Sequence, residues 1–145
     1  MSSPVCIDAS LIIRTLVPGP FSDQALLLLH RWQEEKAQLL APALLAFEVT
    51  STLRRLVYLG ELTSVEGEEA FAHFLRMDIH LSNRRGILPL AWRLAQELNR
   101  PRAYDTAYLA LAQLLECDFW TADERLYNVA AAKLGFVKWI GSIGC

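Results

Sequence analysis

Short apolar segments alternate along the chain with longer segments in which apolar residues recur at helical spacing. The short segments predict strands at residues 5–7, 39–41, 79–81, 119–121 and 137–140. The helical spacing predicts helices at residues 10–17, 22–36, 44–58, 64–76, 87–99, 104–115 and 124–134. Strands that alternate with helices are typical of a parallel sheet. We therefore expect an α/β fold, with about five parallel strands and helices on both faces.

A few residues set the boundaries of the predicted helices. Pro18 ends the first helix, because proline is not tolerated inside one. Ser22 or Asp23 is expected to cap the second helix. The fourth helix begins at Ser64 with a Ser-x-x-Gly sequence, which is not a full capping box. The helix at residues 104–115 is almost wholly apolar, so we expect it to be buried.

The composition adds an expectation about assembly. The 145 residues suit one domain, residues 1–145, without a linker or an internal repeat. Hydrophobic residues make up 53% of the chain, against roughly 45–50% in an average soluble domain. The helices at residues 22–36 and 44–58 carry more apolar residues than one buried stripe needs. We therefore expect a homodimer that also binds a smaller protein through apolar surface.

Cysteine usage and the absence of long apolar segments restrict the class of protein. Cys6, Cys117 and Cys145 are scattered and contain no Cys-x-x-Cys pair, so neither a disulfide framework nor a zinc site is indicated. We expect Cys6, Cys117 and the four tryptophans to be core residues. No segment approaches the ~20 apolar residues of a membrane span, and the first residues do not resemble a cleavable leader. A soluble, cytoplasmic protein is expected.

Several chemistries of α/β proteins lack the residues that they need. There is no GxGxxG after the first strand and no GxxxxGK[ST], so the phosphate-binding loops of dinucleotide and P-loop proteins are missing. There is no GxSxG sequence for an esterase. Phosphatases that form an aspartyl phosphate usually carry Asp-x-Asp after the first strand, where this chain has Asp8-Ala9-Ser10. That reading is disfavoured but stays open. The three histidines are isolated on amphipathic segments, which argues against a histidine-driven nuclease.

Four acids stand where a predicted strand has just ended or a predicted helix begins: Asp8, Glu48, Asp105 and Asp123. In an open parallel sheet, ligands bind outside the carboxyl ends of the strands. All four side chains are therefore expected along one edge of the sheet. Uncompensated carboxylates repel one another, and a hard cation such as Mg²⁺, which takes oxygen ligands, is the simplest group to neutralise them.

Each acid also has an ordinary structural reading. Asp8 has the least convincing one, because Ser10 is expected to cap the following helix without it. A buried, unpaired Glu48 would be costly, but the side chain has the alternative of pairing with Arg54 or Arg55.

Asp105 and Asp123, taken singly, are more often helix caps or partners of the helix dipole. Their functional reading depends on the other two acids lying at the same edge of the sheet. Arg125 starts a helix beside Asp123, and guanidinium groups bind phosphates well. We therefore expect Arg125 to contact a substrate phosphate, with ordinary ion pairing as the alternative.

With these residues, the chain resembles PIN domains, and in particular the VapC-type toxins of bacterial and archaeal toxin–antitoxin pairs. The resembling segments are residues 5–10 (Val-Cys-Ile-Asp-Ala-Ser), 42–49 (Pro-Ala-Leu-Leu-Ala-Phe-Glu-Val), 104–112 (Tyr-Asp-Thr-Ala-Tyr-Leu-Ala-Leu-Ala) and 121–126 (Thr-Ala-Asp-Glu-Arg-Leu). They occur in the expected order and together span nearly the whole chain.

The resemblance implies a Rossmann-like PIN fold, a Mg²⁺- or Mn²⁺-dependent endoribonuclease, a homodimer and a cognate antitoxin. Asp8, Glu48, Asp105 and Asp123 match the acidic quartet of the family. Ser10 and Thr121 match small polar positions beside it. Some relatives carry a further acid after the last of the four, where this chain has Asn128, so the number of metals bound stays open.

Two other functions stay open at this point. One is a PIN-like nuclease that processes RNA or acts on DNA without any antitoxin. The other is an interaction module without enzymatic activity, in which the four acids are helix caps and ion-pair partners.

Overall fold

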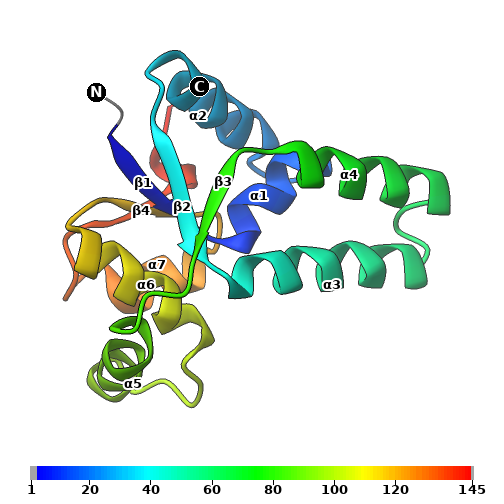
Figure 1. The fold of residues 1–145 in the computed structure, drawn as a ribbon. Coiled ribbons are helices and arrows are strands. Elements are labelled where there is room, and N and C mark those ends of the chain that lie inside the picture. Colours follow the sequence, from blue (N-terminus) through cyan, green and yellow to red (C-terminus); the bar gives the residue numbers. More distant parts are fainter. Residues whose placement is uncertain (1–2, 145) are drawn as a thin grey trace.

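The computed structural model describes residues 3–144, so the terminal Cys145 lies outside the part described. Within it, the strands form one five-stranded sheet at the centre of the molecule (Figure 1). The strands are β1 (Pro4–Ile7), β2 (Gln38–Pro42), β3 (Ile79–Ser82), β4 (Phe119–Thr121) and β5 (Val137–Trp139). Their order is β3-β2-β1-β4-β5, and every neighbouring pair is parallel. The predicted α/β fold with five parallel strands is confirmed.

The helices in this part of the chain follow the predicted order. They are α1 (Ala9–Leu16), α2 (Ser22–Glu34), α3 (Leu44–Tyr58), α4 (Ser64–Arg76), α5 (Ile87–Glu97), α6 (Tyr104–Leu115), α7 (Glu124–Ala130) and the short 3-10 helix η1 (Ile140–Ser142). Figure 1 shows α5, α6 and α7 on one side of the sheet and α1 and α2 on the other, while α3 and α4 form a projecting pair.

The predicted ends of two helices and one strand were wrong. The helix α5 ends two residues before Asn99, because Asn99 adopts the left-handed conformation (φ 52°) and the Arg100 N–H donates back to the Ala95 carbonyl. This pattern closes a helix. The helix α7 ends at Ala130 and is followed by turns, and β5 ends at Trp139, where η1 begins.

Two predictions about helix caps were also wrong. Phe21, in the left-handed conformation, precedes α2 without a side-chain cap, while the Ser22 hydroxyl accepts from the Gly19 N–H instead. The helix α4 does begin with a capping box, which is formed by Thr63 and Glu66 and so starts one residue before Ser64.

The core is centred on the sheet and on α6. Residues 106–112 of α6 are all buried, as expected, and α6 packs on β1, β2 and β4. The thiol sulfurs of Cys6 and Cys117 lie 3.5 Å apart, with Cys6 buried and Cys117 half-buried. The prediction for Trp92 was wrong, since its side chain on α5 is 68% exposed. In residues 3–144, no helix is both long enough and apolar enough to cross a membrane.

The strand order creates a crevice next to the first strand. The chain leaves β1 toward β2 on one side of the sheet and leaves β4 toward β5 on the other. The carboxyl ends of β1 and β4 therefore form the point at which the order reverses, where ligands bind in open α/β sheets. Asp8 follows β1 directly and Asp123 follows β4 closely.

Candidate functional site

Asp8 is held in place by three donors at the carboxyl end of β1. Its Oδ1 accepts hydrogen bonds from the Ser10 hydroxyl (2.7 Å) and the Leu11 N–H (3.1 Å), and its Oδ2 accepts from the Thr121 hydroxyl (2.6 Å). Asp8 is therefore the N-cap of α1. The expectation that Ser10 would cap this helix was wrong, so Asp8 serves both the helix and the site.

Ser10 and Thr121 connect the ends of β1 and β4. Their hydroxyl oxygens lie 3.2 Å apart, and each accepts a backbone N–H from the segment after β4: Ser10 from Ala122 (3.0 Å) and Thr121 from Asp123 (2.9 Å). Thr121 is fully buried and Ser10 is half-buried, so this network is partly shielded from solvent. The two small polar residues fix the orientation of the Asp8 carboxylate relative to the Asp123 backbone.

Glu48 lies in α3, one turn after the helix begins, and is half-buried. The Tyr108 hydroxyl of α6 donates a hydrogen bond to its Oε1. The structure records no ion pair of Glu48 with Arg54 or Arg55, whose side chains are exposed. Within the described residues, the hydrogen bond from Tyr108 therefore agrees better with a place for Glu48 in the site than with an arginine ion pair.

Asp105 and Asp123 stand at the starts of α6 and α7. Asp105 lies in the first turn of α6 and is half-buried. Asp123 is the N-cap of α7, with its Oδ1 accepting from the N–H groups of Arg125 (2.9 Å) and Leu126 (3.3 Å). Asp123 therefore caps a helix, as its structural interpretation predicted, and it also lies at the edge of the sheet.

The pKa values show that these carboxylates share a common environment. Burial raises the pKa of Asp8 to about 6, although the hydrogen bonds from Thr121, Ser10 and Leu11 act the other way. Burial also raises the pKa of Glu48 and of Asp105. The charge of Asp105 adds to the rise at Asp8 and Glu48, and that of Asp123 adds to the rise at Asp105. Close carboxylates that disfavour one another's charge provide a place for a cation.

All four predicted acids line one cavity of about 440 Å³, which we call the acid cavity. The structure thus brings together the residues that the sequence singled out. The described residues nevertheless contain no group of three or more carboxylates already arranged as metal ligands. One Glu48 oxygen faces Tyr108 and one Asp123 oxygen caps α7, so coordination by three of the acids needs side-chain rotation. By donor chemistry, the oxygen-only set fits Mg²⁺ or Mn²⁺.

Two further residues of the acid cavity were missed by the sequence analysis. Tyr108 follows Asp105 by three positions and so shares its helical face, which was the available signal. Its hydroxyl touches Glu48 although the ring is buried, and burial raises its pKa. Arg14 of α1 also lines the cavity, and its guanidinium packs against Gly19. Nothing in its spacing distinguished it from an ordinary helical arginine.

Arg125 is placed differently from the four acids. Its side chain is exposed at the start of α7 and does not line the acid cavity, while its backbone N–H binds Asp123. A contact with substrate therefore stays a prediction. The three histidines are exposed, and His30 pairs with Glu34 at 2.9 Å, so none stands at the cavity.

Comparison with known proteins gives a consistent result. A family model described as a PIN domain matches residues 6–136. Two relatives are each 33% identical over 92 residues, which is 63% of this chain and 70% of theirs. They are named VapC ribonuclease Mb0985, from Mycobacterium bovis, and Ribonuclease VapC9, from Mycobacterium tuberculosis. The crystal structure of PAE2754 from Pyrobaculum aerophilum matches with a TM-score of 0.63 at 19% identity, over 98% of this chain and 94% of that one. The latter likeness concerns the fold.

Proposed function

This chain belongs to the PIN domain family, and from that premise we propose that it is an endoribonuclease that depends on a divalent metal. One observation carries the proposal: carboxylates from four separate segments line the same cavity at the reversal of strand order. The names of the two mycobacterial relatives support RNA as the substrate.

Asp8, Glu48, Asp105 and Asp123 are the residues that would hold Mg²⁺ or Mn²⁺. When bound, such an ion stabilises negative charge on the reacting phosphate and lowers the pKa of an attacking water. The protein supplies the orientation of the carboxylates. Ser10 and Thr121 fix Asp8, and the Tyr108 hydroxyl fixes Glu48, so that the acids hold their places against mutual repulsion.

We further propose that the chain is the toxin of a type II toxin–antitoxin pair, acting in the cytoplasm as a homodimer under the control of a cognate antitoxin. The names of the relatives support the pairing. Exposed apolar side chains on α2 and α3 support protein contacts: Leu26 and Leu27 are 48% and 43% exposed, and Phe47 and Tyr58 are 74% and 78% exposed. Apolar surface of this kind commonly marks an interaction site.

The nuclease proposal is tested by incubating the purified chain with a panel of defined RNAs in Mg²⁺, Mn²⁺ or EDTA. We expect cleavage with either metal and none in EDTA. Cleavage that persists in EDTA would contradict the metal dependence, and intact RNA under every condition would contradict the activity. Light scattering tests the assembly, since a monomer at micromolar concentrations would contradict a stable dimer.

One observation favours the interaction module as a second candidate. Within residues 3–144, no ready-made group of three metal ligands is formed. Titration with Mn²⁺, followed by calorimetry, separates the two candidates, because an interaction module has no reason to bind the ion at these carboxylates. Heat of binding that disappears in a variant with Asp8→Asn and Asp105→Asn would support the nuclease.

A further inference from the structure

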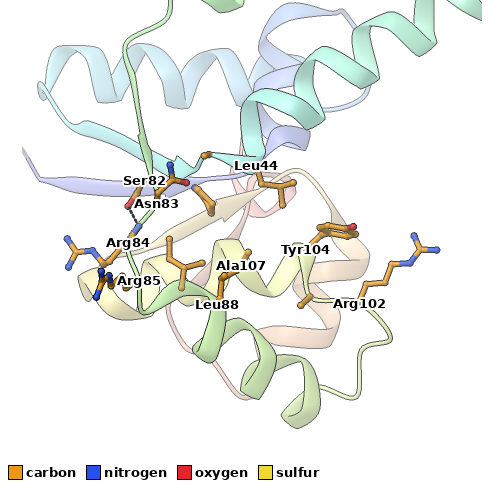
Figure 2. A pocket seen from close by; sticks show the side chains of 13 residues that line it. Leu44, Ser82, Asn83, Arg84, Arg85, Leu88, Arg102, Tyr104 and Ala107 are labelled. Atoms are coloured by element: carbon orange, nitrogen blue, oxygen red, sulfur yellow. Dashed lines mark hydrogen bonds between the residues drawn. The ribbon is translucent and has the colours of Figure 1, made fainter.

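A second hollow, larger than the acid cavity, lies beside it and has the opposite charge. It has a volume of about 840 Å³ and lies between the start of α3, the segment after β3, and helices α5 and α6. We call it the arginine cleft and define it by its apolar residues Leu44, Leu88 and Tyr104 and its arginines Arg84, Arg85 and Arg102. Figure 2 shows Arg84 and Arg85 on one side, Arg102 on the other, and the apolar side chains between them.

The positive charge of the arginine cleft is not neutralised by the groups that line it. In the part of the chain that the structure describes, no Asp or Glu lines the cleft. The side chains of Arg84, Arg85 and Arg102 are exposed. The two ion pairs recorded in residues 3–144 join His30 to Glu34 and Arg93 to Glu97, so neither engages an arginine of the cleft. The cleft therefore attracts an anion.

The apolar part of the cleft contains an exposed aromatic ring close to the arginines. Tyr104 is 57% exposed and Leu88 is 78% exposed, although both line the hollow. Large side chains left in water in this way indicate a partner with apolar surface of its own. An unpaired nucleotide combines both properties, because its base stacks on aromatic rings while its phosphate binds arginine.

The arginine cleft adjoins the acid cavity through shared helices. Tyr104 of the cleft directly precedes Asp105 of the cavity in α6, and Leu44 of the cleft lies one turn before Glu48 in α3. In the same way, Ala107 lines the cleft and the next residue, Tyr108, lines the acid cavity. The two hollows are therefore neighbours. An RNA strand with one phosphodiester at the acids would extend into the arginine cleft.

We propose that the arginine cleft binds a single-stranded segment of the RNA substrate on one side of the cleaved phosphodiester. This inference rests on the proposed function. The bases pack against Tyr104, Leu44 and Leu88, and the phosphates bind Arg84, Arg85 and Arg102. Its volume is in the range of about 300–1,000 Å³ that holds a drug-sized ligand, so it accommodates a short segment. A duplex does not fit this chemistry, because its bases are stacked on one another and cannot reach an aromatic floor.

A second copy of the chain is a poorer occupant of the same cleft. In a two-fold contact, the cleft of one copy would face the cleft of the other. The arginines of each copy would then face a surface that contains arginines and no carboxylate. Like charges placed together across an interface are unfavourable. An RNA strand brings the neutralising charge with it.

The test measures binding of a fluorescent single-stranded RNA oligonucleotide by anisotropy, using the full chain with Asp8→Asn in EDTA so that no cleavage occurs. The test variants are the double variant Arg84→Ala with Arg85→Ala, the single variant Arg102→Ala, and Tyr104→Ala. The matched controls are the double variant Arg54→Ala with Arg55→Ala, which removes equal charge from exposed positions of α3, and Tyr58→Ala, which removes a tyrosine that is 78% exposed.

We expect the cleft double variant to weaken RNA binding about tenfold or more. The slope of log affinity against log salt should become shallower by about 1.4, because about 0.7 is lost for each phosphate of a single strand that is no longer bound. Tyr104→Ala is expected to weaken binding about fivefold or more, the effect typical of removing one stacked base from its aromatic partner. Tyr104→Phe should bind as well as the parent, because the ring rather than the hydroxyl makes the contact. Duplex RNA should bind more weakly and should not respond to Tyr104→Ala.

Equal losses in the cleft and control double variants would overturn the proposal, since that result would reflect general electrostatics. Unchanged RNA binding in all cleft variants would also overturn it. So would a change in oligomeric state on light scattering without a change in RNA affinity, which would assign the cleft to a second copy. The binding assay contains no metal, so failure here is separate from failure of metal-dependent cleavage.

Discussion

The acid cavity and the arginine cleft share α3 and α6, yet they hold their charges in opposite ways. In the cavity, Asp8 is 6% exposed and accepts three hydrogen bonds from protein donors. In the cleft, the arginines lie exposed, and in the described residues no ion pair restrains them. Burying a charge is costly unless it is paired, so the protein has positioned its acids at the expense of stability. Exposed arginines carry no such cost.

This difference indicates how each region contributes. In the proposed function, the buried carboxylates define the place of the reaction, where small displacements matter. The exposed arginines would supply attraction along the RNA backbone, where position matters less. Substitutions in the cavity should therefore affect the chemical step, and substitutions in the cleft should affect binding.

The largest effect is expected for Asp8→Asn. The substitution removes the charge of a proposed metal ligand with little change of shape, so cleavage should fall by about a hundredfold or more. Binding of single-stranded RNA in EDTA should change little, because the cleft is intact. Single-turnover cleavage and anisotropy on the same preparation measure the two quantities. Wild-type cleavage by this variant would remove Asp8 from the site.

The next effect concerns the affinity for Mn²⁺. Glu48→Gln and Asp105→Asn should each weaken binding by at least about tenfold in calorimetry, since each removes one proposed ligand. Glu68→Gln is the matched control, because Glu68 is an exposed residue of α4 that does not line the cavity. Equal losses at all three positions would mean that general electrostatics, and not coordination, attracts the ion.

A smaller effect is expected for Tyr108→Phe, which removes the hydroxyl that donates to Glu48 while keeping the buried ring. Residues that orient a metal ligand typically change metal affinity or activity by about 10–100-fold, and we expect the lower end of that range. Tyr104→Phe in the same helix is the control, because its exposed hydroxyl makes no recorded bond within the site. A loss in both variants would contradict a specific role of Tyr108.

The fold and the four acids were predictable because both follow from local patterns. Apolar segments such as residues 5–7 and the almost wholly apolar α6 identify their structures without help from distant residues. The topology then places the carboxyl ends of β1 and β4 together, which brings Asp8 near Asp123. The prediction of one acidic edge needed only this rule for parallel sheets.

Other features depend on contacts that the sequence pattern does not contain. Tyr108 meets Glu48 across 60 positions, so its role appears only after folding. Asp8 and Ser10 are both good N-caps, and the structure has Asp8 in that role, with its other oxygen accepting from the Thr121 hydroxyl of β4. Trp92 lies in an apolar helix, but α5 covers the outer side of α6 and leaves that tryptophan exposed. The arginine cleft gathers residues from three separate segments.

The stability of the metal-free protein should depend on pH. The pKa of Asp8 is raised by burial to about 6 in the folded state, against about 3.9 in an unfolded chain. Between these values the folded state holds a proton that the unfolded state releases, so stability falls as the pH rises through this window. In EDTA, the melting temperature near pH 7 should therefore be lower than near pH 5.

Asp8→Asn supplies the control for this pH dependence. The neutral amide should raise the melting temperature of the metal-free protein near pH 7 by about 2–4 °C, the shift that about 1 kcal/mol produces in a domain of this size. It should also reduce the difference between the two pH values. Mn²⁺ should stabilise the parent more near pH 7 than near pH 5, where protons compete for the carboxylates. An unchanged pH profile in Asp8→Asn would assign the dependence to other groups.

The smallest effect is expected for Arg125→Ala. Arg125 shares one property with each of the two regions. Its side chain is exposed like the arginines of the cleft, but its backbone N–H binds Asp123 of the cavity. Because alanine keeps that backbone bond, the cap of α7 should remain and Mn²⁺ affinity should not change. Because Arg125 is predicted to contact an RNA phosphate, its removal should flatten the salt dependence of binding by about 0.7 in slope and slow cleavage at subsaturating RNA. If the slope is unchanged, Arg125 serves only as a surface residue of α7. If Mn²⁺ affinity falls as well, the Arg125 side chain supports the acid cavity, and the division between buried acids and exposed arginines does not hold at this position.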